Sequence, residues 1–215
     1  MAVFKLKTPV SEKDVRKMKV NDVLYISGTM VTARDAAHKK ALELVKQCKP
    51  LPVKLEGLAV FHCGPIMKKE GAKWVPVAAG PTTSARMDQF EDEFIKNFKV
   101  RVVVGKGGMG KRTTDAMQKY GAVYGAFTGG AGVLAAKRIK NVKTVEWLDL
   151  GMPEALWVFE VEEFGPLTIA IDSHGNNLYE EVNKKAEEIR KKFYEKLGAH
   201  NSARQNPSES SGRRF

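Results

Sequence analysis

Cysteine is scarce in this chain of 215 residues, which contains only Cys48 and Cys63. The two lie far apart in sequence and neither belongs to a C-x-x-C motif, so this chain alone cannot supply a zinc or iron–sulfur site, nor a disulfide framework. We expect both to be reduced thiols in the core. No apolar run approaches the roughly 20 residues that cross a bilayer, and the first residues, MAVFKLKTPV, contain no signal-peptide core. These absences predict a cytoplasmic protein with no membrane segment.

Aromatic residues make up only 8% of the chain, although its formal net charge is +11. A basic balance suggests an anionic partner, which can be nucleic acid, an acidic subunit or a small substrate. However, no basic run is interleaved with aromatic side chains that could stack on bases. Many lysines instead alternate with glutamates at helical spacing in residues 184–196, which is typical of a solvated helix face. We therefore expect no binding to nucleic acid.

Apolar strands alternate with amphipathic helices along most of the chain. The patterns predict helices at 11–18 (capped by Ser11), 33–48, 83–97, 113–120, 132–139 and 178–197. They predict strands at 23–27, 58–62, 74–78, 100–104, 122–127, 142–150, 157–161 and 167–172, with a polar turn at 68–72. The alternation indicates an α/β domain with a largely parallel sheet, and the strand-rich stretch after residue 142 makes that sheet mixed. Residues 1–198 are predicted to form a single domain, and residues 199–215 a polar, disordered tail.

A glycine-rich loop, GKGGMGK at residues 105–111, follows one of the predicted strands. Such loops let backbone N–H groups surround an anion. The spacing fits two nucleotide motifs, but the chemistry fits neither. Arg112 stands where a P-loop needs the hydroxyl that ligates Mg²⁺, and no acidic residue occurs between Asp115 and Glu146 to hold a ribose. A tight turn that merely requires glycine is one alternative, and a stand-alone anion- or nucleotide-binding module is another.

Three other segments of similar character follow predicted strands or small-residue turns. They are SGTMVTARDAAH at 27–38, HCGP at 62–65 and GPTTSARMD at 80–88. Strand carboxyl ends and helix N-termini converge in parallel α/β folds. Arg34, Arg86 and Lys106 would then form a compact cationic site, where an arginine can clamp a carboxylate with two parallel hydrogen bonds. This site suits a small dicarboxylate better than a polyphosphate, which normally also brings acidic metal ligands.

These segments, together with GKGGM at 105–109 and EALW…FGPLTIAIDSHGNNLY at 154–179, closely resemble the β subunit of iron–sulfur class I fumarate hydratases and L(+)-tartrate dehydratases. The resemblance covers about residues 15–179. It implies a swivelling β/β/α domain and a separate α subunit that carries a [4Fe–4S] cluster on its own cysteines, in an α2β2 heterotetramer. It implies no metal ligand in this chain.

Carried over residue by residue, the resemblance implies one set of substrate-binding side chains: Arg34, Thr82, Thr83, Arg86 and Lys106. Thr82 is also the implied catalytic residue, because it matches the threonine proposed to remove the C3 proton. A threonine hydroxyl can act as a base near neutral pH only if nearby cations stabilise its alkoxide or if it relays a proton. Its alternative role is a helix N-cap. Asp35 is expected to orient Arg34, and His38 to be structural.

The activity implied by the resemblance is reversible hydration of fumarate to (S)-malate, by an enzyme that is active only with its α subunit. Dehydration of L(+)-tartrate is the close alternative, since one hydroxyl separates the substrates. The anion- or nucleotide-binding module stays open as an alternative of a different class.

Overall fold

The computed structural model describes residues 1–196 and divides the chain into two compact units, Met1–Tyr179 and a unit that begins at Glu180. Helix α6 (Leu178–Lys196) accounts for the described part of the second unit. The predicted tail at 199–215 lies outside the described residues, and the single domain over 1–198 stays a prediction. Within residues 1–196, no helix is both long enough and apolar enough to cross a membrane.

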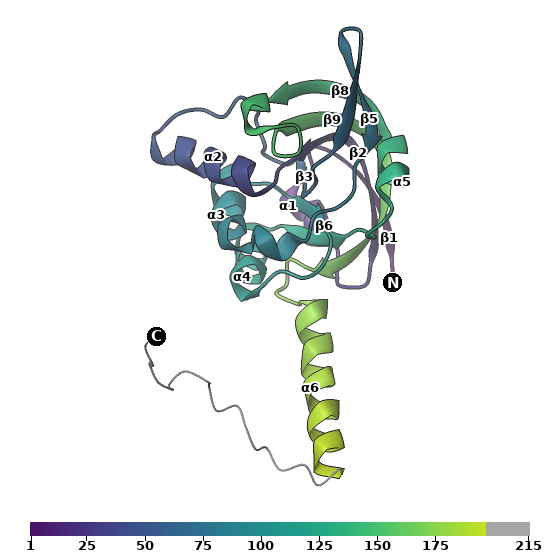
Figure 1. The fold of residues 1–215 in the computed structure, drawn as a ribbon. Coiled ribbons are helices and arrows are strands. Elements are labelled where there is room, and N and C mark those ends of the chain that lie inside the picture. The colour runs from purple at the N-terminus through teal and green to yellow at the C-terminus, as the bar shows by residue number, and fades with distance from the viewer. Residues whose placement is uncertain (197–215) are drawn as a thin grey trace, which may run out of the picture. The chain divides into compact units, whose positions relative to one another are not determined.

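A sheet of seven strands forms the centre of the first unit (Figure 1). In sheet order these strands are β1 (Val3–Lys7), β2 (Val23–Thr32), β3 (Ala59–Phe61), β6 (Val102–Gly105), β7 (Val123–Ala126), β9 (Leu156–Ile171) and β8 (Ile139–Glu146). The first five are parallel to their neighbours, whereas β9 runs antiparallel to β7, β8 and β2. Because β9 pairs with both β7 and β2, the sheet closes on itself. The predicted α/β fold with a mixed, largely parallel sheet is confirmed.

Alternate residues of the strands enter two separate cores. In β6, Val102 and Val104 belong to one core and Val103 to the other, and all three are fully buried. The second core lies against α2 (Asp35–Lys46), α3 (Asp88–Phe98) and α4 (Lys111–Tyr120), which cover one side of the sheet, while α5 (Gly132–Lys137) lies on another side (Figure 1). This explains the continuous apolar run of the strand, because strands buried on both faces lack polar alternation.

The shorter elements connect this framework. They are α1 (Glu12–Val15), the hairpin strands β4 (Ile66–Glu70) and β5 (Lys73–Ala78), and the 3₁₀ helices η1 (Ser84–Arg86) and η2 (Leu148–Leu150). Ser11 caps α1 as predicted, since its side chain accepts a hydrogen bond from the backbone N–H of Asp14. The hairpin forms a two-stranded sheet of its own.

Several predicted boundaries were wrong. Most of the polar turn predicted at 68–72 belongs to β4, whose polar residues are exposed because the hairpin is only two strands wide. The strands predicted at 157–161 and 167–172 are one strand, β9, which stays paired with β2 through two register shifts. The strand predicted at 142–150 ends at Glu146, and η2 follows. The helix predicted at 11–18 shrinks to one turn, and β1 was not predicted.

Candidate active site

The carboxyl ends of β2, β3 and β6 meet at one edge of the sheet, because these strands are parallel neighbours. Arg34 follows β2 and starts α2, His62 directly follows β3, and Lys106 directly follows β6. The chain thereby brings three of its predicted strand-end segments together at one edge of the sheet.

The loop between β5 and α3 is fastened across this edge by backbone hydrogen bonds. The N–H of Thr82 donates to the carbonyl of His62 at 2.6 Å, and the N–H of Ser84 donates to the carbonyl of Lys106 at 2.9 Å. The N–H of Lys106 in turn donates to the carbonyl of Thr82 at 3.3 Å. Helix η1 starts at Ser84 with Thr83 at its N-cap position and no side-chain cap, so the alternative role of Thr82 as a helix cap is wrong.

Two arginines of the predicted set are held by carboxylates. The Nε of Arg34 lies 3.1 Å from Oε1 of Glu154, whose Oε2 accepts the N–H of Ala36 at 3.0 Å. Arg86 binds Asp35 through two contacts, Nη2–Oδ2 at 2.6 Å and Nε–Oδ1 at 3.3 Å. The structure therefore corrects the expected partner of Asp35, which is Arg86 and not Arg34. Glu154 was missed as the partner of Arg34, since nothing in the GMPEALW segment marks it.

Thr82 and Lys106 have no such partners. Both are half-buried, and no described residue pairs with the Lys106 ammonium or hydrogen bonds with the Thr82 hydroxyl. The Lys106 side chain runs past Gly129, where an added Cβ would lie 3.9 Å from Nζ. An ammonium and a hydroxyl on adjoining backbone segments are thus available to a ligand. Thr83 is exposed beside them.

Two glycines of the site are required for space. A Cβ on Gly64 would lie 2.5 Å from Nη1 of Arg34, and a Cβ on Gly105 would lie 1.9 Å from the Oγ of Ser84. Gly64 belongs to the HCGP segment and Gly105 opens the glycine-rich loop. Gly105 is therefore required for close packing against η1, whereas Gly107, with a φ of +75°, is the loop glycine in a left-handed turn conformation.

Gly105→Ala is expected to lower the free energy of unfolding by about 1–3 kcal/mol, because the new methyl group overlaps a buried side chain. Urea denaturation of the isolated chain measures the loss. Gly80→Ala is the matched control, since the nearest atom to its added Cβ is 3.8 Å away. Equal stability of the two variants would contradict the packing argument.

A buried cluster of three titratable side chains lies behind the loop. His38, His62 and Glu91 are fully buried, and their ligand-type atoms all lie within 4.8 Å of one another. The Nε2 of His62 donates to Oε2 of Glu91 at 2.9 Å, and the Nε2 of His38 lies 3.3 Å from the same oxygen. Glu91 was missed in the sequence, although it falls four residues after Met87 and four before Ile95, on the buried face of α3.

Burial and mutual contact shift the protonation of this cluster. Burial lowers the pKa of His62 below its usual 6.5, and the charge of Glu91 opposes that shift. Burial acts to raise the pKa of Glu91, but the histidines outweigh it through charge and hydrogen bonds and lower that pKa to about 2. Glu91 is therefore an ionised hydrogen-bond acceptor near neutral pH.

The free energy of unfolding should fall as the pH drops below about 6.5. An unfolded His62 then binds a proton that the buried ring resists, so up to about 1 kcal/mol is lost per pH unit. Urea denaturation between pH 7.5 and 5.5 measures this effect. An unchanged slope in His62→Gln would contradict this assignment.

The two cysteines differ in environment. Cys63 is buried, and burial raises the pKa of its thiol far above the usual range. Cys48 is exposed just after α2, so the prediction of a second core thiol was wrong. One inert thiol and one isolated thiol do not make the ligand set of an iron–sulfur cluster.

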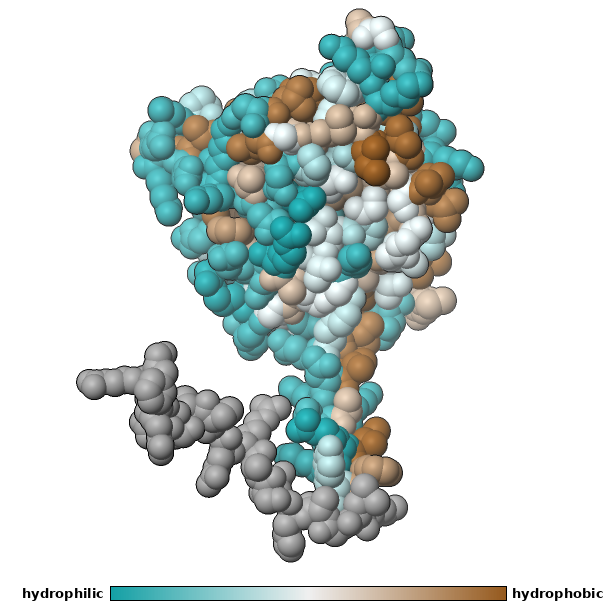
Figure 2. Space-filling model, viewed as in Figure 1, coloured by the Kyte–Doolittle hydropathy of each residue, from teal (hydrophilic) through white to brown (hydrophobic). Residues whose placement is uncertain are grey.

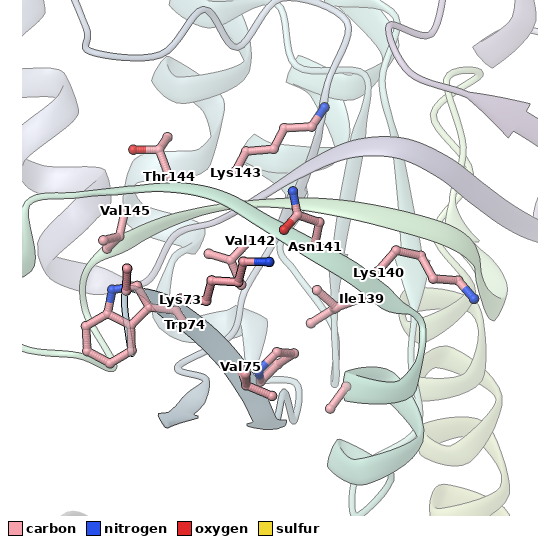
Figure 3. Close-up of a pocket in the computed structure, with 13 residues that line it drawn as sticks. Lys73, Trp74, Val75, Ile139, Lys140, Asn141, Val142, Lys143, Thr144 and Val145 are labelled. Atoms are coloured by element: carbon pink, nitrogen blue, oxygen red, sulfur yellow. The ribbon is translucent and has the colours of Figure 1, made fainter. Parts of the chain in front are cut away.

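A pocket of about 780 Å³ lies away from this edge, between β5 and β8 (Figure 3). It contains none of the predicted site residues. Lys140 is paired with Glu162 at 2.8 Å and Lys143 with Glu160, and Figure 3 shows Lys143 and Thr144 pointing away from Trp74 and Val75. The strand-end site remains the better candidate for a dianion because it combines the Lys106 ammonium and the Thr82 hydroxyl, neither of which has a partner among the described residues.

Comparisons with known proteins indicate the family of the chain. The sequence profile described as fumarase C-terminus matches residues 2–182. The L(+)-tartrate dehydratase subunit beta of Escherichia coli (strain K12) is 47% identical over 195 residues, which cover 91% of this chain and 96% of that protein. The putative L(+)-tartrate dehydratase subunit beta of Methanocaldococcus jannaschii is 51% identical over 189 residues, covering 87% and 93%. A putative fumarate hydratase class I of Geobacillus stearothermophilus is 40% identical over 194 residues, covering 90% of this chain but 37% of that protein.

Proposed function

The chain belongs to the fumarase C-terminus family, and from this premise we propose that it is the β subunit of a two-subunit iron–sulfur hydro-lyase that reversibly hydrates fumarate to (S)-malate. One observation carries the proposal. Arg34, Thr82, Arg86 and Lys106 project from segments that meet at the carboxyl edge of β2, β3 and β6. Cations and a free hydroxyl on one edge suit a small dicarboxylate.

Each of these residues would have its own role in the reaction. Arg34 and Arg86 bind the two carboxylates, since a guanidinium can form paired hydrogen bonds with each. In the dehydration direction, Thr82 accepts the C3 proton. The neighbouring carboxylate then gains charge as an aci-carboxylate, which Lys106 and Arg86 stabilise. The same cations favour the Thr82 alkoxide, which a free threonine could not reach near neutral pH.

The iron–sulfur cluster of such an enzyme does not fit the residues of this chain. Cys63 is buried with a raised pKa, and Cys48 is exposed elsewhere. We therefore assign the [4Fe–4S] cluster to the α subunit, in an α2β2 assembly. The remaining 63% of the Geobacillus protein, beyond the matched 37%, is long enough to contain such a partner on the same polypeptide.

L(+)-tartrate is the second candidate substrate, and the names of the relatives favour it. The two candidates are separated by initial rates of the assembled α/β complex, measured without oxygen on fumarate and on L(+)-tartrate. A higher kcat/KM on fumarate supports the first proposal, and a higher kcat/KM on tartrate replaces it with the second. No turnover of either acid by a complex with an intact cluster would contradict both.

An apolar surface borders the candidate site and is our proposed contact with the cluster-bearing polypeptide. Figure 2 shows apolar surface over β5 and α5. Its exposed side chains are Ile66, Val75, Val77, Val133 and Leu134. The hairpin and α5 are joined where the N–H of Ala79 donates to the carbonyl of Gly132 at 2.9 Å, three residues before Thr82. This closeness in sequence to Thr82 supports the placement of the partner on this side of the unit.

Val77→Glu combined with Leu134→Glu should weaken assembly with the α subunit by about 10- to 100-fold in Kd, because charges replace apolar anchors. Sedimentation velocity with the purified α subunit measures the change. Val3→Glu is the control, since Val3 is an exposed apolar residue on β1. If the double variant and the Val3→Glu control weaken assembly equally, or if the double variant does not weaken it, the contact with the α subunit lies elsewhere.

A further inference from the structure

The buried Glu91 carboxylate is the centre of a hydrogen-bond network that none of the proposed substrate residues joins with its side chain. Its Oε2 accepts a hydrogen bond from Nε2 of His62 at 2.9 Å and lies 3.3 Å from Nε2 of His38. The other ring nitrogen of His62, Nδ1, lies 2.9 Å from the Oγ of Ser84. The hydroxyl of Tyr124 lies 2.9 Å from the Oγ of Ser84 and 2.9 Å from the carbonyl of Gly107, and its single hydrogen is shared between these two acceptors. All the side chains in this network are fully buried.

Each branch of the network ends on the backbone of a segment that carries a proposed substrate residue. The Nδ1 of His38 is 2.9 Å from the carbonyl of Arg34. The carbonyl of His62 accepts the N–H of Thr82 at 2.6 Å. The Tyr124 branch holds the carbonyl of Gly107, next to Lys106. One carboxylate is therefore connected to all three segments.

From this arrangement we propose that Glu91 is a positioning residue for the reaction, which sets the backbone of Arg34 through His38 and that of Thr82 and Lys106 through His62, Ser84 and Tyr124. The proposal rests on the function proposed above. It adds a role for α3 and for the Tyr124 hydroxyl that the substrate residues themselves do not reveal. Misplacing a catalytic group by about 1 Å can cost up to about 10²-fold in rate, so such supports matter.

The chemistry of the donors and acceptors determines the direction of each hydrogen bond in the network. A carbonyl oxygen only accepts, so His38 donates from Nδ1 to Arg34. His62 donates from Nε2 to Glu91, and its Nδ1, when the ring is neutral, accepts the Ser84 hydroxyl. Only three potential ligand groups meet here, all sealed from solvent, whereas structural zinc sites use four ligands. Hydrogen bonding accounts for the contact of His62 with Oε2 of Glu91, whereas Nε2 of His38 and Oε1 of Glu91 have no hydrogen-bond partner among the described residues.

Two single-branch variants in the assembled α/β complex separate positioning from mere stability. Ser84→Ala cuts the connection to Gly107 and leaves Glu91 with both histidines, so kcat should fall about tenfold with KM near the wild-type value. His38→Leu cuts the connection to Arg34, so KM should rise about tenfold with a smaller change in kcat. A general loss of stability would not produce this opposite split.

Two variants at Glu91 itself complete the test. Glu91→Gln can still accept from His62 when its amide oxygen takes the place of Oε2, so kcat should stay within about fivefold of wild type. Glu91→Leu removes the acceptor of Nε2 of His62 and the carboxylate beside His38, and kcat should fall by between about 10- and 100-fold. Leu24→Ala is the stability control. Leu24 is a buried core residue near the start of β2, whereas the candidate site lies at the carboxyl end of that strand.

The outcomes are distinct. Near-normal kcat for Glu91→Leu in an assembled, folded complex overturns the inference, as does an equal loss of kcat in a Leu24→Ala protein of similar melting temperature. One equivalent of metal in the isolated wild-type chain that is lost in Glu91→Gln would replace the network with a metal site. If the wild-type complex itself turns over no dicarboxylate, the proposed function fails and this role has no basis.

Discussion

Thr82→Val in the assembled α/β complex is expected to lower kcat by about 10²–10⁴, the range over which a positioned acid or base contributes. Valine keeps the shape of threonine and removes only the hydroxyl. That hydroxyl has no partner among the described residues, and its backbone is fixed between His62 and Lys106. The loss should therefore fall on proton transfer and leave KM nearly unchanged. Steady-state rates under anoxic conditions measure both constants.

Thr82→Ser is the control for this change, because serine restores a hydroxyl on the same backbone. It should recover most of the activity, to within about tenfold of wild type. A Thr82→Val enzyme with near-normal kcat would remove Thr82 from the chemistry. Loss of activity in Thr82→Ser equal to that in Thr82→Val would point to the methyl group and packing.

Lys106→Met should lower kcat by about 10²–10³, the cost of removing one group that stabilises developing negative charge. Lys106 is half-buried and has no ion-pair partner in the described chain, so its charge is available where the aci-carboxylate forms. Methionine keeps the length of the side chain and removes the ammonium. The measurement is kcat on the preferred dicarboxylate.

Lys111→Met is the matched control, since Lys111 lies in the same glycine-rich segment but is exposed and paired with Asp115. Its kcat should stay within about twofold of wild type, because exposed ion pairs contribute little. Similar losses in the two variants would mean that the overall charge of the loop matters, and would contradict a specific role for Lys106.

The framework of the sheet could be predicted because its central strands are apolar and sit between amphipathic helices. The VVV run of β6 and the alternation of helices and strands led directly to parallel strands with converging carboxyl ends. Strands β1 and β4 were missed because lysines and other exposed side chains occupy them, at a sheet edge and in a two-stranded hairpin. The long β9 was divided at Gly165-Pro166, since pairing with β2 through that point depends on the closed sheet.

The candidate site could be predicted only in part from the sequence, because some of its contacts join residues that are far apart in the chain. Arg34, Arg86 and Lys106 stand in segments that contain glycine and follow strands or small-residue turns, which local patterns reveal. The partners that hold them do not, because Glu154 is 120 positions away from Arg34 and Asp35 binds Arg86 across 51 positions. Glu91 was hidden because an acidic residue on a helix is normally solvated, and only its place between Met87 and Ile95 on the buried face could have indicated otherwise.

The proposal that this chain is half of a hydro-lyase is tested by complementation. Fumarate consumption is followed by ultraviolet absorbance without oxygen, for this chain alone, for a cluster-loaded α subunit alone, and for the two combined. We expect turnover only in the combination, with Thr82→Val and Lys106→Met chains assembling normally but failing to restore it. Full activity of the α subunit alone, or a combined enzyme that is indifferent to both variants, would show that the site described at the edge of β2, β3 and β6 does not carry the reaction.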